Sequence, residues 1–176
     1  MRIIQTITIM LLAALLGGCA ALSSGGPETV VLINCGASAD QAAADGRVWQ
    51  ADRDFSGGDT VQRPMAIVLK TEDAFIYLNE RYDPSAYRIP LENGTYELKL
   101  HFAETYYEIY AAGQRVFTVT VEGAPVLAGF DPFAEAGKPF ATVVKTVPVT
   151  VSDGELTIGF EPKVQSPMIN GIEVLK

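Results

Sequence analysis

The stretch GTYELKLHFA, from Gly94 to Ala103, alternates apolar and polar side chains along its length. In an extended chain successive side chains point to opposite sides, so this period of two predicts a β-strand with one buried and one solvent-facing side. The side chains expected in the core are Tyr96, Leu98, Leu100 and Phe102. Those expected to face solvent are Glu97, Lys99 and His101.

Short apolar runs separated by Gly, Asn, Asp and Pro fill the rest of the chain from Thr29 onward. Further strands are expected at 115–121, 142–151, 155–160 and 168–175. Residues 36–58 are polar and glycine-punctuated and contain the single tryptophan, Trp49, which predicts a long ordered loop lying over the strands. The predicted fold class is all-β, an antiparallel β-sandwich, formed as one domain by residues 29–176.

The first 18 residues have the form of a signal peptide, with a basic residue, a short apolar run and small residues before Cys19. The apolar run is too short for a helix that spans a bilayer. Residues 16–19, LGGC, also resemble the bacterial lipoprotein box. We therefore expect residues 1–18 to be removed, Cys19 to carry lipid, and residues 19–28 to form a flexible tether. The alternative is an ordinary cleaved signal with a chance cysteine.

The 176-residue chain has a formal net charge of −8 at pH 7. Such acidity argues against nucleic acid or an anionic bilayer surface as the ligand, and a neutral ligand is the simpler expectation. With Cys19 lipidated, Cys35 has no disulfide partner, and its apolar run predicts a small buried side chain. No cofactor is expected, and no sequence motif for a metal ion is present.

Catalytic residues are sparse in this sequence. The single histidine, His101, is expected to face solvent, and no serine lies in a nucleophile-elbow motif. Carboxylate pairs are the remaining enzymatic route, because glycoside cleavage needs two carboxyl groups facing each other across a sugar. Glu80, Glu104 and Glu108 lie near aromatic residues and are the candidates for it. In a chain with 21 acidic residues, glutamates lie near aromatic residues by chance, so we expect that the protein is not an enzyme.

Tyrosines gather in two short stretches, residues 76–82 and 105–110, both close to expected strand ends or loops. A tyrosine ring stacks on the C–H face of a sugar while its hydroxyl group forms hydrogen bonds, which suits a neutral polyol. The competing interpretation is that these tyrosines pack in the core. Loops held by a rigid sheet are the usual location of binding residues.

Seven motifs occur in order along the chain and together resemble the malectin family. They are VLINCG (31–36), DGRVW (45–49), FSGG (55–58), ERY (80–82), GTYELKLHFAETYY (94–107), GQRVF (113–117) and INGIEV (169–174). The resemblance implies a β-sandwich of jelly-roll type, malectin-like and galactose-binding-like, that binds carbohydrate. Animal malectin binds glucose-containing disaccharides.

The resemblance also implies a set of binding residues. The tyrosine that ends the ERY motif is Tyr82, and the aromatic pair after FAE is Tyr106 and Tyr107. A family aspartate before the last strand has no counterpart, because Gln165 stands there, so the sugar preference is not carried over. The predicted carbohydrate-binding residues are Tyr82, Tyr106, Tyr107, Glu104 and Gln165. Among them, Glu104 is expected to be a structural hydrogen-bonding residue at the strand end rather than a proton donor.

The leading hypothesis is therefore a non-catalytic carbohydrate-binding domain of a bacterial envelope, attached through lipid on Cys19 and located at the outer membrane. Its expected ligand is a neutral oligosaccharide, and glucose-containing di- or oligosaccharides are the first candidates. The alternative is a structural lipoprotein that contacts an envelope protein or peptidoglycan through the same tyrosines. A glycosidase is the third hypothesis.

Overall fold

The structure, a computed structural model, describes residues 28–63, 68 and 70–176. The expected signal peptide, Cys19 and all of the expected tether except Glu28 lie outside the described residues. The strands are β1 (Thr29–Asn34), β2 (Gln41–Ala42), β3 (Val48–Trp49), β4 (Phe55–Ser56), β5 (Asp59–Gln62), β6 (Asn79–Tyr82), β7 (Ala86–Pro90), β8 (Gly94–Ala103), β9 (Val116–Val121), β10 (Ala124–Phe130), β11 (Thr142–Val151), β12 (Glu155–Val164), β13 (Met168–Ile169) and β14 (Gly171–Leu175). The helices are α1 (Ala74–Leu78) and α2 (Pro132–Ala136).

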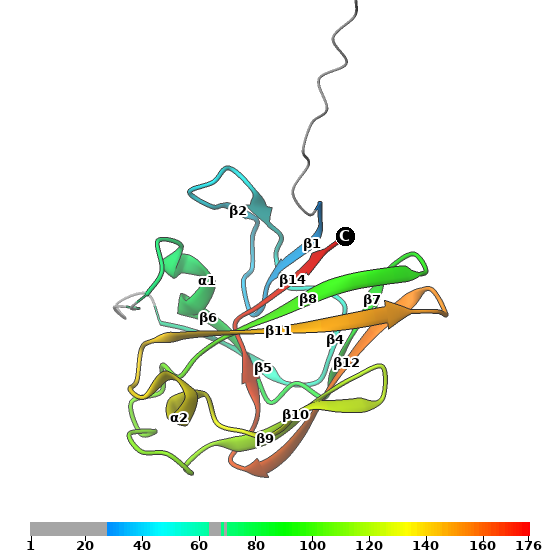
Figure 1. Ribbon diagram of the computed structural model, residues 1–176. Coiled ribbons are helices and arrows are strands. Elements are labelled where there is room, and N and C mark those ends of the chain that lie inside the picture. The colour runs from blue at the N-terminus through cyan, green and yellow to red at the C-terminus, as the bar shows by residue number, and fades with distance from the viewer. Residues whose placement is uncertain (1–27, 64–67, 69) are drawn as a thin grey trace, which may run out of the picture.

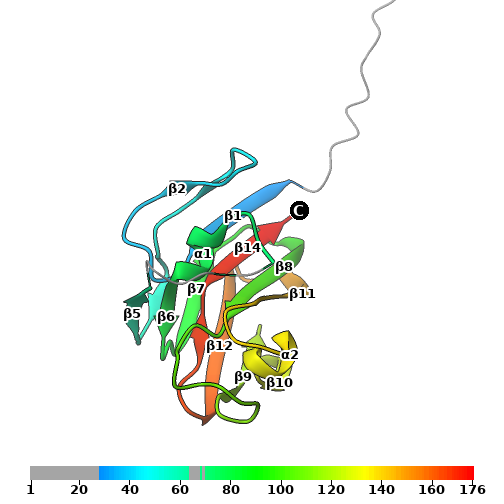
Figure 2. The same ribbon diagram turned by 90° about the vertical axis from the view of Figure 1, so that its left-hand side faces the viewer.

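Two antiparallel sheets form the body of the molecule, with strand orders β1-β14-β8-β11 and β10-β9-β12-β7-β4 (Figure 1). The view turned by 90° shows them as two layers (Figure 2). A three-stranded sheet, β13-β6-β5, and the β2-β3 pair complete the fold. The predicted all-β sandwich is confirmed.

Strand β8 occupies the position that its alternating sequence predicts. It pairs with β11 over its whole length, from Thr142 opposite Ala103 to Val151 opposite Gly94. The four side chains expected in the core are all buried, and the ring of Phe102 lies 4.7 Å from that of Phe130, centroid to centroid. Inward-facing residues of both sheets thus share one core.

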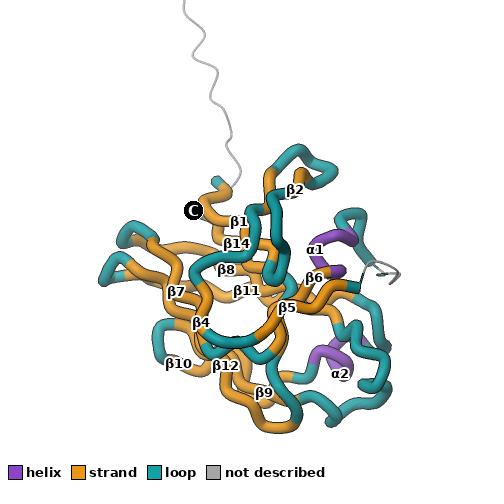
Figure 3. The backbone as a smooth tube through the Cα atoms, turned by 180° about the vertical axis from the view of Figure 1, so that it is seen from behind, coloured by secondary structure: helices purple, strands orange, loops and turns teal. Residues whose placement is uncertain are grey.

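The interpretation of residues 36–58 as one long loop is wrong in part. The segment contains the short strands β2, β3 and β4, which Figure 3 shows alternating with loops. Trp49, on β3, is buried in a second hydrophobic cluster with Leu32, Ile76 and Tyr77. The segment therefore covers part of the outer face of the sheet that contains β8.

The expectation that His101 faces solvent is also wrong, because this cover lies over it. His101 is only 8% exposed. The Tyr77 hydroxyl group lies 2.9 Å from its Nδ1 atom, and the Trp49 ring packs edge-on with the centroids 5.2 Å apart. The His101 ring, whose Nε2 atom lies 3.5 Å from the carboxylate, and a hydrogen bond from Arg47 lower the pKa of Glu173, on the neighbouring strand, to about 2. The outer face of β8 is thus a buried polar cluster at this end.

Cys35 is fully buried, as predicted, and burial raises the pKa of its thiol well above the ordinary value. The two ends of the described chain lie side by side in Figure 1, because β1 pairs with β14. Glu28 and Lys176 exchange two backbone hydrogen bonds, of 3.0 and 2.8 Å. Neither α1 nor α2, the helices of the described residues, has the length and apolar character that a membrane-spanning helix needs.

Candidate functional site

A pocket of about 360 Å³ opens where four separate segments of the chain meet. Its lining residues come from β5 and the residue after it, from β6, from the loop between β8 and β9, and from the loop between β12 and β13. They are Val61, Arg63, Glu80, Tyr82, Tyr106, Arg115 and Gln165. Three of the predicted site residues, Tyr82, Tyr106 and Gln165, therefore lie in one pocket.

Strand alternation in β6 directs Tyr82 into this pocket. Glu80 and Tyr82 share one side of the strand and line the pocket, while Arg81, between them, faces the other way. Arg81 donates from Nε to Asp52 Oδ2 over 2.8 Å, and its guanidinium group lies 3.4 Å from the centroid of the Phe55 ring. The Arg81 contacts thus hold β6 on the side that faces away from the pocket. Phe55 belongs to this support and does not line the pocket.

The chain leaves β8 at Ala103 and separates the two adjacent tyrosines. Tyr106 is half-buried and lines the pocket, whereas Tyr107 is 73% exposed and lies outside it. A tight turn, closed by a hydrogen bond of 3.0 Å from Ile109 N to the Tyr106 carbonyl oxygen, causes this separation. The two rings still touch edge-on, with their centroids 5.3 Å apart. Tyr107 therefore adjoins the pocket without lining it.

Tyr106 offers a ligand two groups, a phenol hydroxyl group and an aromatic ring. A hydrogen bond with the neighbouring Glu108 carboxylate raises the pKa of its phenol. The guanidinium group of Arg63 lies 5.5 Å from the ring centroid, within the range of a cation–π contact. Such a ring can stack on a sugar and also donate to a sugar oxygen.

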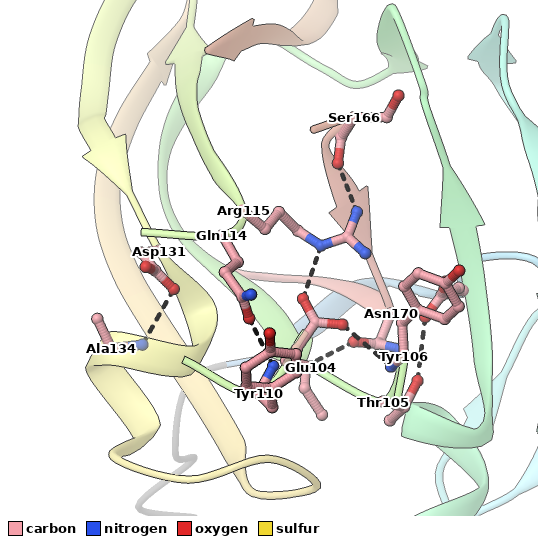
Figure 4. A network of polar contacts seen from close by, with 12 residues as sticks. Glu104, Thr105, Tyr106, Tyr110, Gln114, Arg115, Asp131, Ala134, Ser166 and Asn170 are labelled. Carbon is pink, nitrogen blue, oxygen red and sulfur yellow. Dashed lines mark hydrogen bonds and ion pairs between the residues drawn. The ribbon is translucent and has the colours of Figure 1, made fainter. Parts of the chain in front are cut away.

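Glu104 lies beneath the pocket and is almost completely buried (Figure 4). Its Oε1 atom accepts from the Tyr106 backbone N–H over 3.0 Å, and its Oε2 atom accepts from Arg115 Nε over 2.6 Å. The prediction that Glu104 accepts a backbone hydrogen bond at the strand end is confirmed. Burial raises the pKa of Glu104, and the Arg115 charge and these hydrogen bonds oppose that shift.

Gln165 occupies the loop between β12 and β13 with a backbone φ of +58°. Residues other than glycine adopt this left-handed conformation rarely, and such strain concentrates at binding sites. Gln165 is one of the residues that line the pocket. An amide side chain both donates and accepts, as a sugar hydroxyl group does.

Sequence reasoning missed Arg63, Arg115 and Val61 as lining residues, and it considered Glu80 only as a catalytic candidate. Arg115 belongs to the GQRVF motif, but nothing in that motif indicates the partner 11 residues earlier. Arg63 donates to Thr105 Oγ1 over 2.9 Å and to Glu80 Oε1 over 3.3 Å. These partners come together only in the folded chain.

The charged groups of the pocket are matched in pairs. Arg63 pairs with Glu80, and Arg115 pairs with Glu104, so the two guanidinium groups are neutralised by two carboxylates. Glu80 also accepts from the Thr105 hydroxyl group over 3.1 Å. Both oxygens of each carboxylate thus already accept hydrogen bonds. This arrangement suits binding of an uncharged polar ligand better than proton transfer.

Metal ligation has no structural support within the described part of the chain. No group of three or more His, Cys, Asp or Glu side chains gathers there in a way that could hold an ion.

Comparison with known proteins identifies one domain family over most of the chain. A family model described as the malectin domain matches residues 29–172. A kinesin-like protein of rice, KIN-14E (Oryza sativa subsp. japonica), is 32% identical over 157 residues, which are 85% of this chain and 14% of the relative. The chain therefore spans only a small part of that relative's length.

Solved structures share the fold at low sequence identity. A chain in the crystal structure of the plant peptide RALF23 in complex with FER and LLG2 matches with a TM-score of 0.74 and 21% identity, over 85% of this chain and 49% of the other. A β-glucuronidase of Bacteroides uniformis gives a TM-score of 0.74 at 20% identity, covering 82% of this chain and 18% of the enzyme. At these identities the likeness concerns the fold alone.

Proposed function

The chain belongs to the malectin domain family, and from that premise we propose that it binds saccharides in the pocket lined by Tyr82, Tyr106 and Gln165. The observation that carries this proposal is the convergence of two aromatic rings and one amide on a single pocket. An aromatic face supplies the apolar contact that a sugar's C–H groups need, and the amide and phenol groups match its hydroxyl groups.

The proposed ligand is uncharged, with glucose-containing di- or oligosaccharides as the first candidates. The paired charges of the pocket support this choice, because a carboxylate or phosphate on the ligand would face glutamates as well as arginines. A pocket of about 360 Å³ also lies at the lower end of the range for small-molecule sites, which fits one or two sugar rings.

We propose that binding occurs without catalysis. Glu80 and Glu104 already hold arginine side chains, so neither carboxylate is available to protonate a leaving group. A glycosidase would need a carboxyl group free to take up and release a proton within the pocket.

Titration of the protein, purified in detergent, with maltose, nigerose and longer glucans tests this proposal. The expected dissociation constants are on the order of 10 µM to 1 mM, because few contacts are available to offset the cost of association. Replacing Tyr82 or Tyr106 by alanine should weaken binding about tenfold or more.

Tyr110→Ala is the matched control for this titration. Tyr110 lies on the same loop, is 72% exposed and does not line the pocket, so its loss should leave the affinity unchanged. Absence of binding to a broad glycan panel would contradict the proposal.

A protein partner is the second candidate function. The rings of Tyr107 and Tyr110 are 73% and 72% exposed, and exposed tyrosines are frequent in protein interfaces. A blank glycan panel together with stoichiometric recovery of one envelope protein would favour this alternative.

We further propose attachment to a bacterial envelope, at the outer membrane, through lipid on Cys19. The support is the LGGC sequence at 16–19 and the polar residues that follow it. A fatty-acid analogue fed to producing cells should label the wild-type protein and should not label Cys19→Ser. Equal labelling of both would place the lipid elsewhere, and no labelling of either would exclude it.

A further inference from the structure

Arg115 is a deeply buried charged group of the pocket, with a side chain only 2% exposed. It directly precedes β9 and reaches across to two other segments (Figure 4). A charged side chain is rarely buried to this degree unless each of its contacts is satisfied. The contacts of Arg115 therefore indicate what its burial maintains.

The first contact is with the loop that presents Tyr106. Arg115 Nε donates to Glu104 Oε2 over 2.6 Å, and the other oxygen of the same carboxylate accepts from the Tyr106 backbone N–H over 3.0 Å. Glu104 thus transmits the position of Arg115 to the backbone of Tyr106. Because Glu104 is itself buried, this contact is not loosened by water.

The second contact is with the loop that presents Gln165. Arg115 Nη1 donates to the Ser166 carbonyl oxygen over 2.5 Å, one residue after the left-handed backbone of Gln165. The next residue, Pro167, accepts from the Asp83 N–H over 2.8 Å. This bond joins the loop to the residue after Tyr82.

The Tyr82 ring also lies within reach of Arg115 directly. The guanidinium carbon is 5.6 Å from the ring centroid, within the range of a cation–π contact. The Tyr82 ring and the backbone segments that carry Tyr106 and Gln165 are therefore all connected to one guanidinium group.

We propose that Arg115 is the positioning residue of this pocket, and that it fixes Tyr106, Gln165 and Tyr82 relative to one another. This inference rests on the proposed saccharide function and names the group that preorganises its site. Saccharide contacts are few and weak, so a site that must order three loops on binding would lose most of its affinity.

Lysine cannot replace arginine in this role. The planar guanidinium group donates along fixed, divergent directions, and here Nε and Nη1 serve two different loops. A lysine ammonium group keeps the charge that Glu104 needs, but it is a single point on a flexible stem. Arg115→Lys should therefore keep a positive charge near Glu104 but lose the two directed hydrogen bonds that hold the loops of Tyr106 and Gln165.

The matched control is Arg81→Lys. Arg81 is also buried, bonds to the buried Asp52 and donates a further hydrogen bond to the Gly58 carbonyl oxygen, over 3.0 Å. It faces away from the pocket and does not line it. Arg81→Lys should lower the thermal unfolding midpoint to a similar degree, so it separates loss of stability from loss of positioning.

The experiment measures amide hydrogen exchange by NMR and saccharide affinity by calorimetry, both well below the unfolding midpoint of each variant. In Arg115→Lys the amides of Tyr106 and Asp83 should exchange about tenfold faster, and the affinity for the best glucan should fall about tenfold. In Arg81→Lys the Tyr106 amide should exchange at the wild-type rate, because none of the Arg81 contacts reaches the loop of Tyr106.

Unchanged exchange and affinity in Arg115→Lys, or an equal change of Tyr106 exchange in the two variants, would overturn the inference. If the wild type binds no saccharide, the proposed function fails, and the exchange rates alone decide whether Arg115 positions the pocket. If Arg115→Lys does not fold, Glu104→Gln takes its place. Faster exchange of the Tyr106 amide is again expected, and an unchanged rate would overturn the inference.

Discussion

Replacing Glu104 by alanine should lower the free energy of unfolding by about 3–5 kcal/mol. The substitution leaves the guanidinium group of Arg115 buried without its counter-charge, and it removes the acceptor of the Tyr106 N–H. Desolvation of an unmatched charge is among the largest destabilising effects a single substitution has. Urea unfolding followed by the fluorescence of the buried Trp49 measures the change.

Glu135→Ala is the control for this comparison. Glu135 also forms an ion pair, with Lys145, but its side chain is 45% exposed, so water can replace the partner. A loss of at most about 1 kcal/mol is expected there. Similar losses for the two variants would mean that burial does not govern the Glu104 pair.

Replacing Gly36 by alanine should destabilise the protein by about 3 kcal/mol or more. Gly36 has a φ of +84°, and an added Cβ would overlap the backbone carbonyl group of Glu80, lying 2.6 Å from its carbon. The left-handed conformation alone costs a non-glycine residue about 1–2 kcal/mol, and the clash with β6 adds to it. Because β6 carries Glu80 and Tyr82, the saccharide affinity should also fall.

Gly46→Ala isolates the conformational part of this effect. Gly46 has nearly the same φ, +83°, but nothing lies within 4 Å of the added Cβ. Gly46→Ala should therefore lower the free energy of unfolding by only about 1–2 kcal/mol and leave the saccharide affinity unchanged. A Gly36→Ala protein as stable as Gly46→Ala would show that β6 moves aside freely.

The sandwich was predictable because its signal is local. Alternation of apolar and polar residues sets which side of a strand is buried, and the limits predicted for 94–103 and 142–151 match β8 and β11. The strand predicted at 155–160 continues to Val164, where its side chains are exposed and alternation no longer marks it.

Burial of the outer face of β8 was not predictable from alternation. His101 is covered by Trp49 and Tyr77, which come from distant segments with no pattern that assigns them to β8.

The site was predictable only in its outline. Family resemblance located Tyr82, Tyr106 and Gln165, which the structure brings together, and Tyr107, which it leaves outside the pocket. Their roles in binding remain predictions. The arginines were missed because an arginine in a sequence does not indicate its partner. Only the folded chain brings Arg115 to Glu104 and to Ser166.

The pairing of β1 with β14 determines how the domain would respond to a mechanical load. The strands are antiparallel, and Glu28 and Lys176 are hydrogen-bonded neighbours at one end of their ladder. A force that pulls these two residues apart acts along the inter-strand hydrogen bonds, which then break one after another as in unzipping. A pull between Glu28 and the far end of β14 would instead load the whole ladder in shear.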